Sequence, residues 1–240
     1  MPQDVTKDII AIKKWISTET YLPQDLDDKM VLKFLHSCYF DLENTKTCID
    51  RFCSTRAQMP EVYRDRDPLS PIYFFRLISS YKFNNNQFFI YKYDDPTLQT
   101  FQFYNVLKGL SIQTDVWIKS CQPLADEVYV IIDMSYYSFR MVPRVNILYF
   151  KNFLVHLLES TPVRVTKVIG INAPFYYDKL YALVKPILPA EIKRIIHFYT
   201  DYEGMYQIID KKYLPKEYGG EAESMYEQYQ DWCKRIQYER

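Results

Sequence analysis

Hydrophobic residues in the first 60 positions recur at helical spacing. Ile9, Ile12 and Ile16 lie three and four residues apart, so they share one side of a helix. A second amphipathic stretch follows, and Asp41 stands before a third, where its side chain can cap the helix. The pattern predicts a bundle of three short helices, which is too small to be stable alone and packs on the remainder of the chain.

From residue 72 onward, short runs of β-branched and aromatic residues alternate with amphipathic stretches. The runs predict strands at 87–93, 127–134, 163–171 and 195–200. The stretches between and after them predict helices at 98–119, 143–159, 175–184, 190–194 and 203–210. Strands separated by helices predict an α/β fold, in which helices cover a sheet.

The expected domain organisation rests on these two patterns. Residues 1–60 form an N-terminal helical domain, and residues 72–221 form the α/β domain. Residues 222–240 are a polar tail with a weak helical pattern. The segment 60–71 begins and ends with proline and carries several charges, so it is the expected linker.

Residues 163–188 are the most informative stretch, because a β-rich run leads into a helix that is apolar nearly all round. Asn172 can cap this helix, and Pro174 fits its first turn. A surface helix normally keeps one polar face, so this one is either wedged in a core or is a movable lid over an apolar cavity. Its apolar residues form two stripes, and the sequence does not decide which faces inward: Tyr176, Leu180, Leu183, Val184 and Ile187, or Tyr177, Tyr181 and Leu188.

The composition and the motifs of the chain argue against several classes of function. The chain of 240 residues has 30 basic and 30 acidic residues, so no global field attracts nucleic acid. Only 5 residues are glycine, and no G-x-G-x-x-G, G-x-x-x-x-G-K or G-x-S-x-G motif is present, which argues against nucleotide enzymes and α/β hydrolases. His36, His156 and His197 have no acidic or cysteine partner at ligand spacing, so we expect no metal. No nucleophile–base pair stands out, so we expect neither enzyme activity nor a cofactor.

The cysteines bear on the cellular compartment. The 5 cysteines are odd in number and form no C-x-x-C pair, which fits free thiols in a reducing compartment. The N-terminus has no apolar signal core, and no run approaches about 18 apolar residues. The sequence therefore predicts a soluble, cytoplasmic protein.

Four stretches together resemble one family. Residues 31–35 with 40–42 look like its N-terminal helical signature, and 130–135 look like its central strand. Residues 168–174 with 185–188 look like its strand and gate helix, and 214–221 look like its closing motif. In this order and spacing, they resemble the CRAL-TRIO (Sec14-like) lipid-transfer proteins, in the branch that holds the α-tocopherol transfer protein, the cellular retinaldehyde-binding protein and their insect relatives.

The resemblance implies a mixed sheet that forms the floor of a hydrophobic pocket, closed by a gate. We call residues 174–188 the gate segment. His156 could give a ligand a hydrogen bond, although a buried structural histidine is the simpler interpretation. The resemblance places further residues at the ligand, and the alternative for each of them is ordinary core packing. These residues are Ile132, Phe153, Leu157, Val163, Val168, Phe175, Leu180, Leu183, Val184 and Ile187.

Some relatives bind phosphoinositide head groups through a basic cluster beside the gate, and here the match is partial. Arg164 is basic at one position of this cluster, but Thr166, Glu191 and Ile195 occupy other positions that are basic in those relatives. Each Lys or Arg near an anionic surface contributes ~1 kcal/mol. The residues that could form a head-group or membrane patch are Arg164, Lys167, Lys185, Lys193 and Arg194. The alternative is that they form only a solvated, charged rim.

Three functions remain open from the sequence. The first is a carrier of one small hydrophobic ligand, such as a retinoid, tocopherol or carotenoid, that exchanges it at membranes by opening of the gate helix. The second is a phosphoinositide- or phospholipid-binding transfer protein or sensor. The third is a protein-interaction scaffold without a ligand, whose mark is a cavity filled by side chains.

Overall fold

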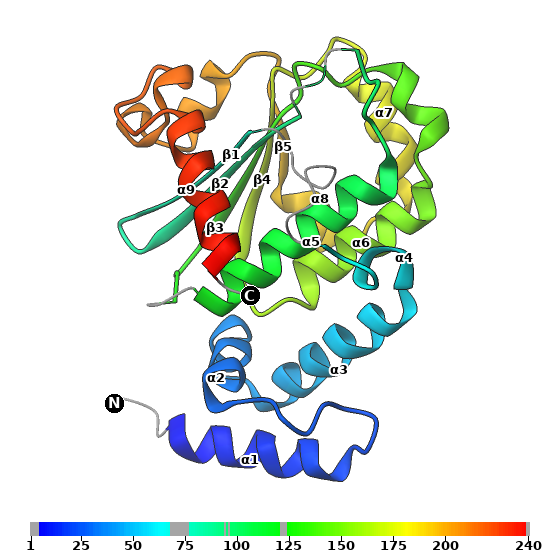
Figure 1. Ribbon diagram of the computed structural model, residues 1–240, viewed down its shortest axis with the longest axis vertical. Coiled ribbons are helices and arrows are strands. Elements are labelled where there is room, and N and C mark those ends of the chain that lie inside the picture. The colour runs from blue at the N-terminus through cyan, green and yellow to red at the C-terminus, as the bar shows by residue number, and fades with distance from the viewer. Residues whose placement is uncertain (1–4, 68–76, 94, 96, 121–123, 239–240) are drawn as a thin grey trace.

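The computed structural model describes residues 5–67, 77–93, 95, 97–120 and 124–238, with the side chains of 77–79, 180 and 236–238 left out (Figure 1). The N-terminal part is helical, as predicted, with α1 (Val5–Thr18), α2 (Asp28–Ser37), α3 (Leu42–Gln58) and α4 (Pro60–Tyr63). Asp41 caps α3 by accepting a hydrogen bond from the backbone N–H of Asn44 at 2.8 Å. The apolar stripe of α1 closes on α2 and α3 around Ile12, Phe34 and Ile49, which are all buried.

The α/β part contains a mixed sheet of five strands in the order β1-β2-β3-β4-β5, which confirms the predicted fold class. Strand β1 runs antiparallel to β2, and the remaining neighbours are parallel. The first strand was absent from the sequence-based prediction. The strands are β1 (Leu77–Phe83), β2 (Asn86–Lys92), β3 (Val128–Asp133), β4 (Val165–Ile171) and β5 (Ile196–Phe198).

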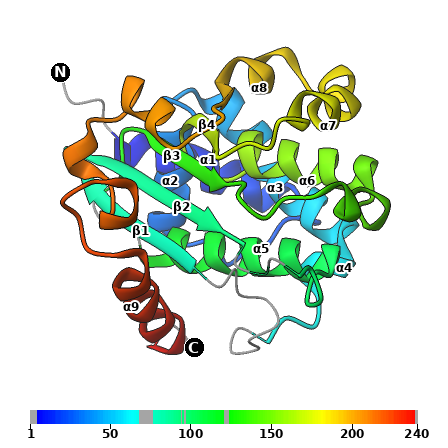
Figure 2. The same cartoon turned by 90° about the horizontal axis from the view of Figure 1, so that it is seen from above.

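Helices cover one face of the sheet, and short 3₁₀ turns cover the other. Helix α5 (Phe103–Ser120), helix α6 (Ile147–Glu159) and α7 (Tyr177–Val184) lie over the first face (Figure 2). The opposite face carries η4 (Glu203–Gln207), η5 (Lys211–Tyr213) and η6 (Lys216–Tyr218). The remaining elements of this part are η2 (Phe139–Arg144), η3 (Lys185–Ile187) and α8 (Ala190–Ile195), and the C-terminal helix α9 (Met225–Tyr238).

Side chains on each strand alternate between the two layers. On β2, Phe89 and Tyr91 point toward the helices, whereas Phe88 and Ile90 pack under the 3₁₀ turns. Strand β3 continues the pattern, with Ile131 buried on the side of the 3₁₀ turns. The helix-facing residues of neighbouring strands therefore form one continuous surface.

The expected linker is packed rather than free over its described part. Val62 in α4 is fully buried, and Arg66 forms an ion pair with Asp115 of α5 at 2.8 Å. Arg56 of α3 binds the same carboxylate through two hydrogen bonds of 2.6 and 2.8 Å. These contacts tie α3 and α4 to α5, while residues 68–71 lie outside the described residues.

The polar tail forms α9, which packs along the edge strand β1 (Figures 1 and 2). Ser224 and Glu227 form a capping box at its start, because the Glu227 backbone N–H donates to the Ser224 hydroxyl at 3.3 Å and the Ser224 backbone N–H donates to the Glu227 carboxylate at 2.9 Å. Trp232 anchors the helix, with only 2% of its surface exposed.

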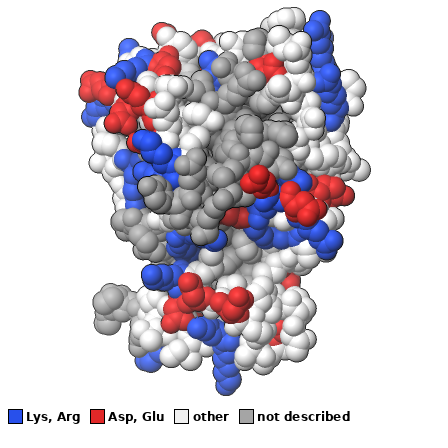
Figure 3. Space-filling view, viewed as in Figure 1, with Lys and Arg blue, Asp and Glu red and all other residues white. Residues whose placement is uncertain are grey.

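Charges of both signs are interspersed on the surface. Figure 3 shows Lys and Arg side chains among Asp and Glu over the described part of the face that it presents, as the equal totals of 30 and 30 suggest.

Candidate ligand-binding cavity

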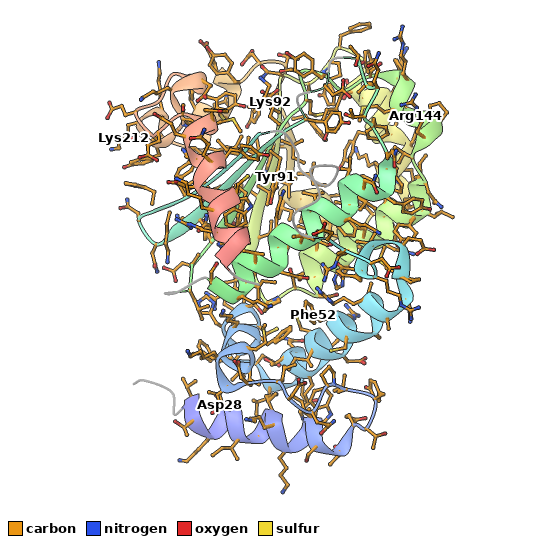
Figure 4. All side chains as sticks on the ribbon, in the orientation of Figure 1. Asp28, Phe52, Tyr91, Lys92, Arg144 and Lys212 are labelled. Atoms are coloured by element: carbon orange, nitrogen blue, oxygen red, sulfur yellow. The ribbon has the colours of Figure 1, made fainter. Side chains whose placement is uncertain are left out.

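A cavity of about 380 Å³ lies between the sheet and the covering helices. Its floor is the helix-facing side of β2, β3 and β4, and Tyr91, labelled in Figure 4, is part of it. Helices α5 and α6 form its walls, and α7 covers it. Representative lining residues are Phe89, Tyr91, Val130, Ile132 and Val168 on the floor, Phe103, Leu110, Phe153 and Leu157 on the walls, and Tyr177, Tyr181 and Val184 on the cover.

The cavity wall offers hydroxyl groups but no charge. Among the described residues that line it, none is Asp, Glu, Lys, Arg or His. Two of its hydroxyls are already used by the protein, since Thr114 donates to the carbonyl of Leu110 and Thr161 donates to that of Leu157. Burial raises the pKa of Tyr137 to about 12, so this phenol stays protonated. An uncharged apolar molecule suits such a wall, because an ion would lose its hydration without gaining a partner.

The inner face of α7 is set by an aromatic contact with β5. The ring of Phe198 lies 5.1 Å from the ring of Tyr177 and 5.1 Å from that of Tyr181. Phe198 reaches this position because β4 has Gly170 beneath it, where an added Cβ atom would come within 2.6 Å of the Phe198 ring. The stripe of Tyr177, Tyr181 and Leu188 therefore faces the cavity, together with Leu183 and Val184.

The gate segment is preceded by a strained residue rather than by a helix cap. Asn172 has a φ of 51°, in the left-handed region, and its side-chain amide donates to Asp133 at 3.0 Å. The predicted capping role of Asn172 is wrong, because α7 begins five residues later and has Tyr176 at its N-cap, whose side chain makes no capping hydrogen bond. Only Pro174 and its neighbours separate this turn from α7.

The carboxylate of Asp133, at the end of β3, accepts hydrogen bonds from several groups. It accepts them from the Tyr218 hydroxyl at 2.9 Å and from the Ser135 backbone N–H at 3.0 Å, besides the Asn172 amide. Burial favours the neutral carboxyl, but these hydrogen bonds outweigh it and lower the pKa of Asp133. The ionised carboxylate thus joins β3, the turn before the gate segment and η6.

Aromatic residues are exposed on the outer side of the gate. Phe175 is 91% exposed and Phe139 is 47% exposed. The ring of Phe139 stacks on Tyr176 at 4.2 Å, and the Tyr176 hydroxyl donates to the carbonyl of Tyr137 at 2.7 Å. Since Tyr137 lines the cavity, this exposed cluster adjoins the cavity wall.

The structure brings most of the predicted ligand residues to the cavity. Phe175 is instead exposed, and Ile187 is not among the lining residues, whereas its neighbour Leu188 is. The side chain of Leu180 lies outside the described residues. The predicted residues that line the cavity are Ile132, Phe153, Leu157, Val163, Val168, Leu183 and Val184.

His156 does not reach the cavity, contrary to the ligand contact suggested by the sequence. Its ring is 1% exposed and lies between Phe52, labelled in Figure 4, at 5.8 Å and Tyr63 at 5.5 Å. Burial, together with the nearby Arg56 guanidinium, lowers the pKa of His156 to about 4. His156 is therefore a neutral packing residue between α6 and the N-terminal helices.

The predicted basic patch is divided among several elements. Arg164 precedes β4, donates to the carbonyl of His36 and lies 4.0 Å from the centre of the Tyr39 ring, so it holds the N-terminal helices. Lys167 lies within β4, and Lys185 lies 5.9 Å from the centre of the Tyr181 ring. Lys193 and Arg194 are in the last turn of α8.

Several cavity residues were missed from the sequence, although a signal for some was present. Phe89, Tyr91 and Tyr93 alternate along the predicted strand 87–93, so one face of it was recognisably apolar. The contribution of α5, through Phe103 and Leu110, had no comparable signal, because α5 is apolar on more than one side.

Metal-binding clusters and membrane-spanning helices are both absent from the described ranges. No group of three or more His, Cys, Asp or Glu side chains is placed there to hold a metal ion. The helices of those ranges include none with the length and apolar character needed to cross a bilayer.

Two family models match different parts of the chain. Residues 77–220 match the family model described as CRAL/TRIO domain, and residues 1–73 match that of the Pinta-like UBA domain. The crystal structure of Sfh5 is similar, with a TM-score of 0.59 and 15% identity, covering 95% of this chain and 92% of that chain. At this identity, the likeness concerns the fold alone.

Curated relatives share limited identity with the chain. Clavesin-1 from Rattus norvegicus is 29% identical over 119 residues, which are 49% of this chain and 34% of Clavesin-1. Alpha-tocopherol transfer protein-like from Mus musculus is 24% identical over 246 residues, covering 92% of this chain and 66% of that protein. The chain thus spans about a third of the length of Clavesin-1. Because the CRAL/TRIO model matches more than half of the chain, the resemblance predicted from the sequence is confirmed, and the chain belongs to the CRAL/TRIO domain family.

Proposed function

We propose that this chain binds one uncharged lipophilic molecule in the cavity beneath α7 and exchanges it at membrane surfaces when the gate segment opens. The observation that carries the proposal is a cavity of about 380 Å³ whose described lining contains no charged side chain. Binding rather than catalysis is the proposed activity. The name of the relative Alpha-tocopherol transfer protein-like, which refers to the transfer of a lipophile, supports the same interpretation.

The open volume favours a carrier over a scaffold. A scaffold that has lost its ligand is expected to fill the cavity with side chains, and this chain has 15 Phe and 23 Tyr available for that purpose. Phe103, Phe150 and Phe153 instead stand around the cavity and leave its centre free. Empty apolar space costs stability, so a bound molecule has a physical reason to be there.

Opening of the gate segment is costly in water and cheaper at a bilayer. Moving α7 exposes Tyr177, Tyr181 and Val184, and apolar surface contributes ~25 cal/mol per Å². Baring roughly 200 Å² therefore costs about 5 kcal/mol in water. Contact with lipid removes much of this cost, which makes release depend on a membrane.

The outer aromatic residues support a membrane as the partner. Phe175 and Phe139 are exposed beside the gate, and Leu183 at its rim is 50% exposed. Clustered exposed apolar residues mark contact surfaces rather than ordinary surface. Lys179 and Lys185 flank Leu183 in the sequence and suit an anionic lipid surface.

The first test is to identify what the purified chain carries. Native mass spectrometry of the intact chain, followed by organic extraction, should find one uncharged lipophile per chain. The variant Ile132→Trp fills the cavity and should lose this molecule, whereas Leu148→Trp on the exposed side of α6 should keep it. A chain that is isolated empty and takes up no retinoid, tocopherol or phospholipid contradicts the proposal and favours the scaffold.

A further inference from the structure

The cavity beneath α7 extends along the whole length of strand β3. Its lining includes Val128, which begins the strand, and Met134, which follows its last residue. A strand rises by about 3.3 Å per residue, so these two residues stand about 20 Å apart along the sheet. Because β2, β3 and β4 run parallel, the cavity has one end at their amino ends and another at their carboxyl ends, where the chain enters the gate segment.

The end of the cavity at the amino ends of the strands is apolar. Val128, Val163 and Val165 lie there, at or just before the first residues of β3 and β4. The hydroxyl of Thr161, two residues before Val163, donates to the carbonyl of Leu157 at 2.5 Å, so its proton is already used. This end therefore suits a hydrocarbon tail.

The end of the cavity at the carboxyl ends of the strands is more polar. Tyr93 follows β2, Tyr137 and Ser138 follow β3, and all three line the cavity. The Tyr93 hydroxyl lies 3.2 Å from that of Thr100, and the Ser138 oxygen accepts a hydrogen bond from the backbone N–H of Arg140 at 3.2 Å. The hydroxyls of Tyr93 and Ser138 therefore already have partners within the protein.

The hydroxyl of Tyr137 differs, because it forms no hydrogen bond with any described residue. Its backbone is held in place, since its N–H donates to the carbonyl of Met134 at 3.0 Å and its carbonyl accepts from the Tyr176 hydroxyl at 2.7 Å. The unpartnered hydroxyl of Tyr81 is sealed inside the protein, whereas the Tyr137 oxygen is not sealed. Because Tyr137 lines the cavity, the open side of its oxygen faces the cavity.

The charge near this end opposes an anionic ligand. Burial and the nearby carboxylate of Asp133 raise the pKa of Tyr137 to about 12, so the phenol stays protonated. The same carboxylate opposes a second negative charge beside it. Lys92, labelled in Figure 4, forms an ion pair with Asp133 at 3.7 Å and is not among the described residues that line the cavity. A carboxylate ligand therefore loses its hydration here without gaining a cation.

We propose that the cavity selects a lipophile with one uncharged oxygen, as in an alcohol, a phenol or a carbonyl compound, and that the Tyr137 hydroxyl forms a hydrogen bond with this oxygen. This selectivity rests on the proposed function as a carrier and adds the chemical class and the orientation of the ligand. The oxygen lies at the carboxyl ends of β2 and β3, and the hydrocarbon tail reaches toward their amino ends. Since Tyr176 of the gate segment bonds to the carbonyl of the same Tyr137, the polar end of the ligand lies next to the gate.

Tyr181 provides the matched comparison. It also lines the cavity with a phenol, but it belongs to α7, where its ring packs on Phe198. Its hydroxyl moves with the gate, whereas Tyr137 belongs to the fixed end of the floor. Replacing either tyrosine with phenylalanine removes one cavity hydroxyl, and only the loss at Tyr137 should change which ligand is preferred.

The test uses the full chain, stripped of bound molecules, and an equimolar mixture of hexadecane, hexadecanol and hexadecanoate, with the bound molecules counted by native mass spectrometry. Tyr137→Phe should lower the ratio of bound hexadecanol to bound hexadecane about fivefold relative to the wild-type chain, because one hydrogen bond is lost. Tyr181→Phe should leave this ratio unchanged. Hexadecanoate at equal concentration should not displace hexadecanol from the wild-type chain.

A second measurement needs no variant. Methyl hexadecanoate presents an uncharged carbonyl, and its infrared carbonyl band in the wild-type chain should lie at lower frequency than in hexane, because a hydrogen bond weakens the C=O bond. A band at the frequency found in hexane overturns the inferred selectivity even if Tyr137→Phe fails to fold.

The outcomes separate this selectivity from the proposed function. Uptake of the probes with the same ratio of hexadecanol to hexadecane in the wild-type chain and in folded Tyr137→Phe, an equal change in Tyr181→Phe, or displacement by hexadecanoate overturns the selectivity and leaves the carrier function standing. Uptake of none of these probes by the wild-type chain contradicts the carrier function itself, and the selectivity with it.

Discussion

The side-chain amide of Asn172 donates a hydrogen bond to the carboxylate of Asp133 at 3.0 Å, which ties the turn before the gate segment to the end of β3. Asn172 also holds a φ of 51°, which costs a non-glycine residue about 1–2 kcal/mol unless local hydrogen bonding offsets it. The bond and the strained turn therefore depend on each other, and they stand two residues before Pro174.

Replacing Asn172 separates these two effects. Asn172→Ala loses the hydrogen bond and keeps the strain, so we expect the free energy of unfolding to fall by about 2 kcal/mol. Asn172→Gly loses the same bond but adopts the backbone angle freely, so its loss should be smaller. Urea denaturation measures both variants. Equal stability of the two variants contradicts a strained turn at this position.

The acid sensitivity of the chain should depend on His156. Its pKa is lowered to about 4 in the folded chain, mainly by burial, against ~6.5 in an unfolded chain. Between these values the unfolded chain binds more protons, so the free energy of unfolding falls as the pH decreases from about 6.5 toward 4. The loss at the lower end is of order 3 kcal/mol, and above the unfolded pKa it is absent.

The variant His156→Phe keeps a ring between Phe52 and Tyr63 but cannot take up a proton. We expect its stability to change less with pH than that of the wild-type chain between pH ~6.5 and ~4, as followed by urea denaturation. His197→Phe is the comparison, and its effect should be smaller because the ring of His197 is only partly buried. Parallel pH curves for His156→Phe and the wild-type chain would show that the histidine ring is not protonated on unfolding.

The sequence was most informative where one pattern decides the structure. Val130 and Ile132 share a face because side chains alternate along a strand, and both line the cavity. Strand β1 was not predicted because Ser79, Ser80 and Lys82 interrupt its apolar pattern. Its strand conformation depends on the antiparallel pairing with β2 rather than on its own residues. Local pattern therefore identified the floor of the cavity better than the edge of the sheet.

Long-range packing decided what the sequence left open. The stripe of Tyr177 and Tyr181 faces inward because Phe198 on β5 lies against both rings, and β5 pairs with β4 only in the folded chain. His156 sits at helical spacing from Phe153 on α6, yet α3 and α4 cover it rather than the cavity. Neither relationship can be obtained from spacing within one helix.

Gly170 should be essential for the position of α7. A Cβ atom at this position would lie 2.6 Å from the Phe198 ring and 2.9 Å from the Met134 sulfur. We expect Gly170→Ala to lower the free energy of unfolding by about 1–3 kcal/mol, because the Phe198 ring must shift. A displaced Phe198 loses its contacts with Tyr177 and Tyr181, so limited proteolysis should cut the gate segment faster.

A second substitution tests whether Phe198 transmits this effect. Phe198→Leu provides space above residue 170, so in the double variant the loss caused by alanine should be smaller than in the wild-type background. The coupling is measured as the difference between the two losses in urea denaturation. Additive losses would indicate that Gly170 is required for a reason other than the approach of the Phe198 ring.

Phe175 should contribute to transfer without contributing to binding. Its side chain is 91% exposed and outside the cavity, so Phe175→Asp should keep the bound molecule and the stability of the chain. If the exposed ring enters the lipid interface, its loss removes about 2 kcal/mol of apolar burial there, which slows transfer between vesicles more than tenfold.

Tyr226→Asp is the matched control, because Tyr226 is a 59% exposed aromatic residue on α9. Transfer measured between fluorescently labelled vesicles should be unchanged in this control. A similar slowing in both variants would mean that added negative charge, rather than the aromatic cluster beside the gate, controls contact with the membrane.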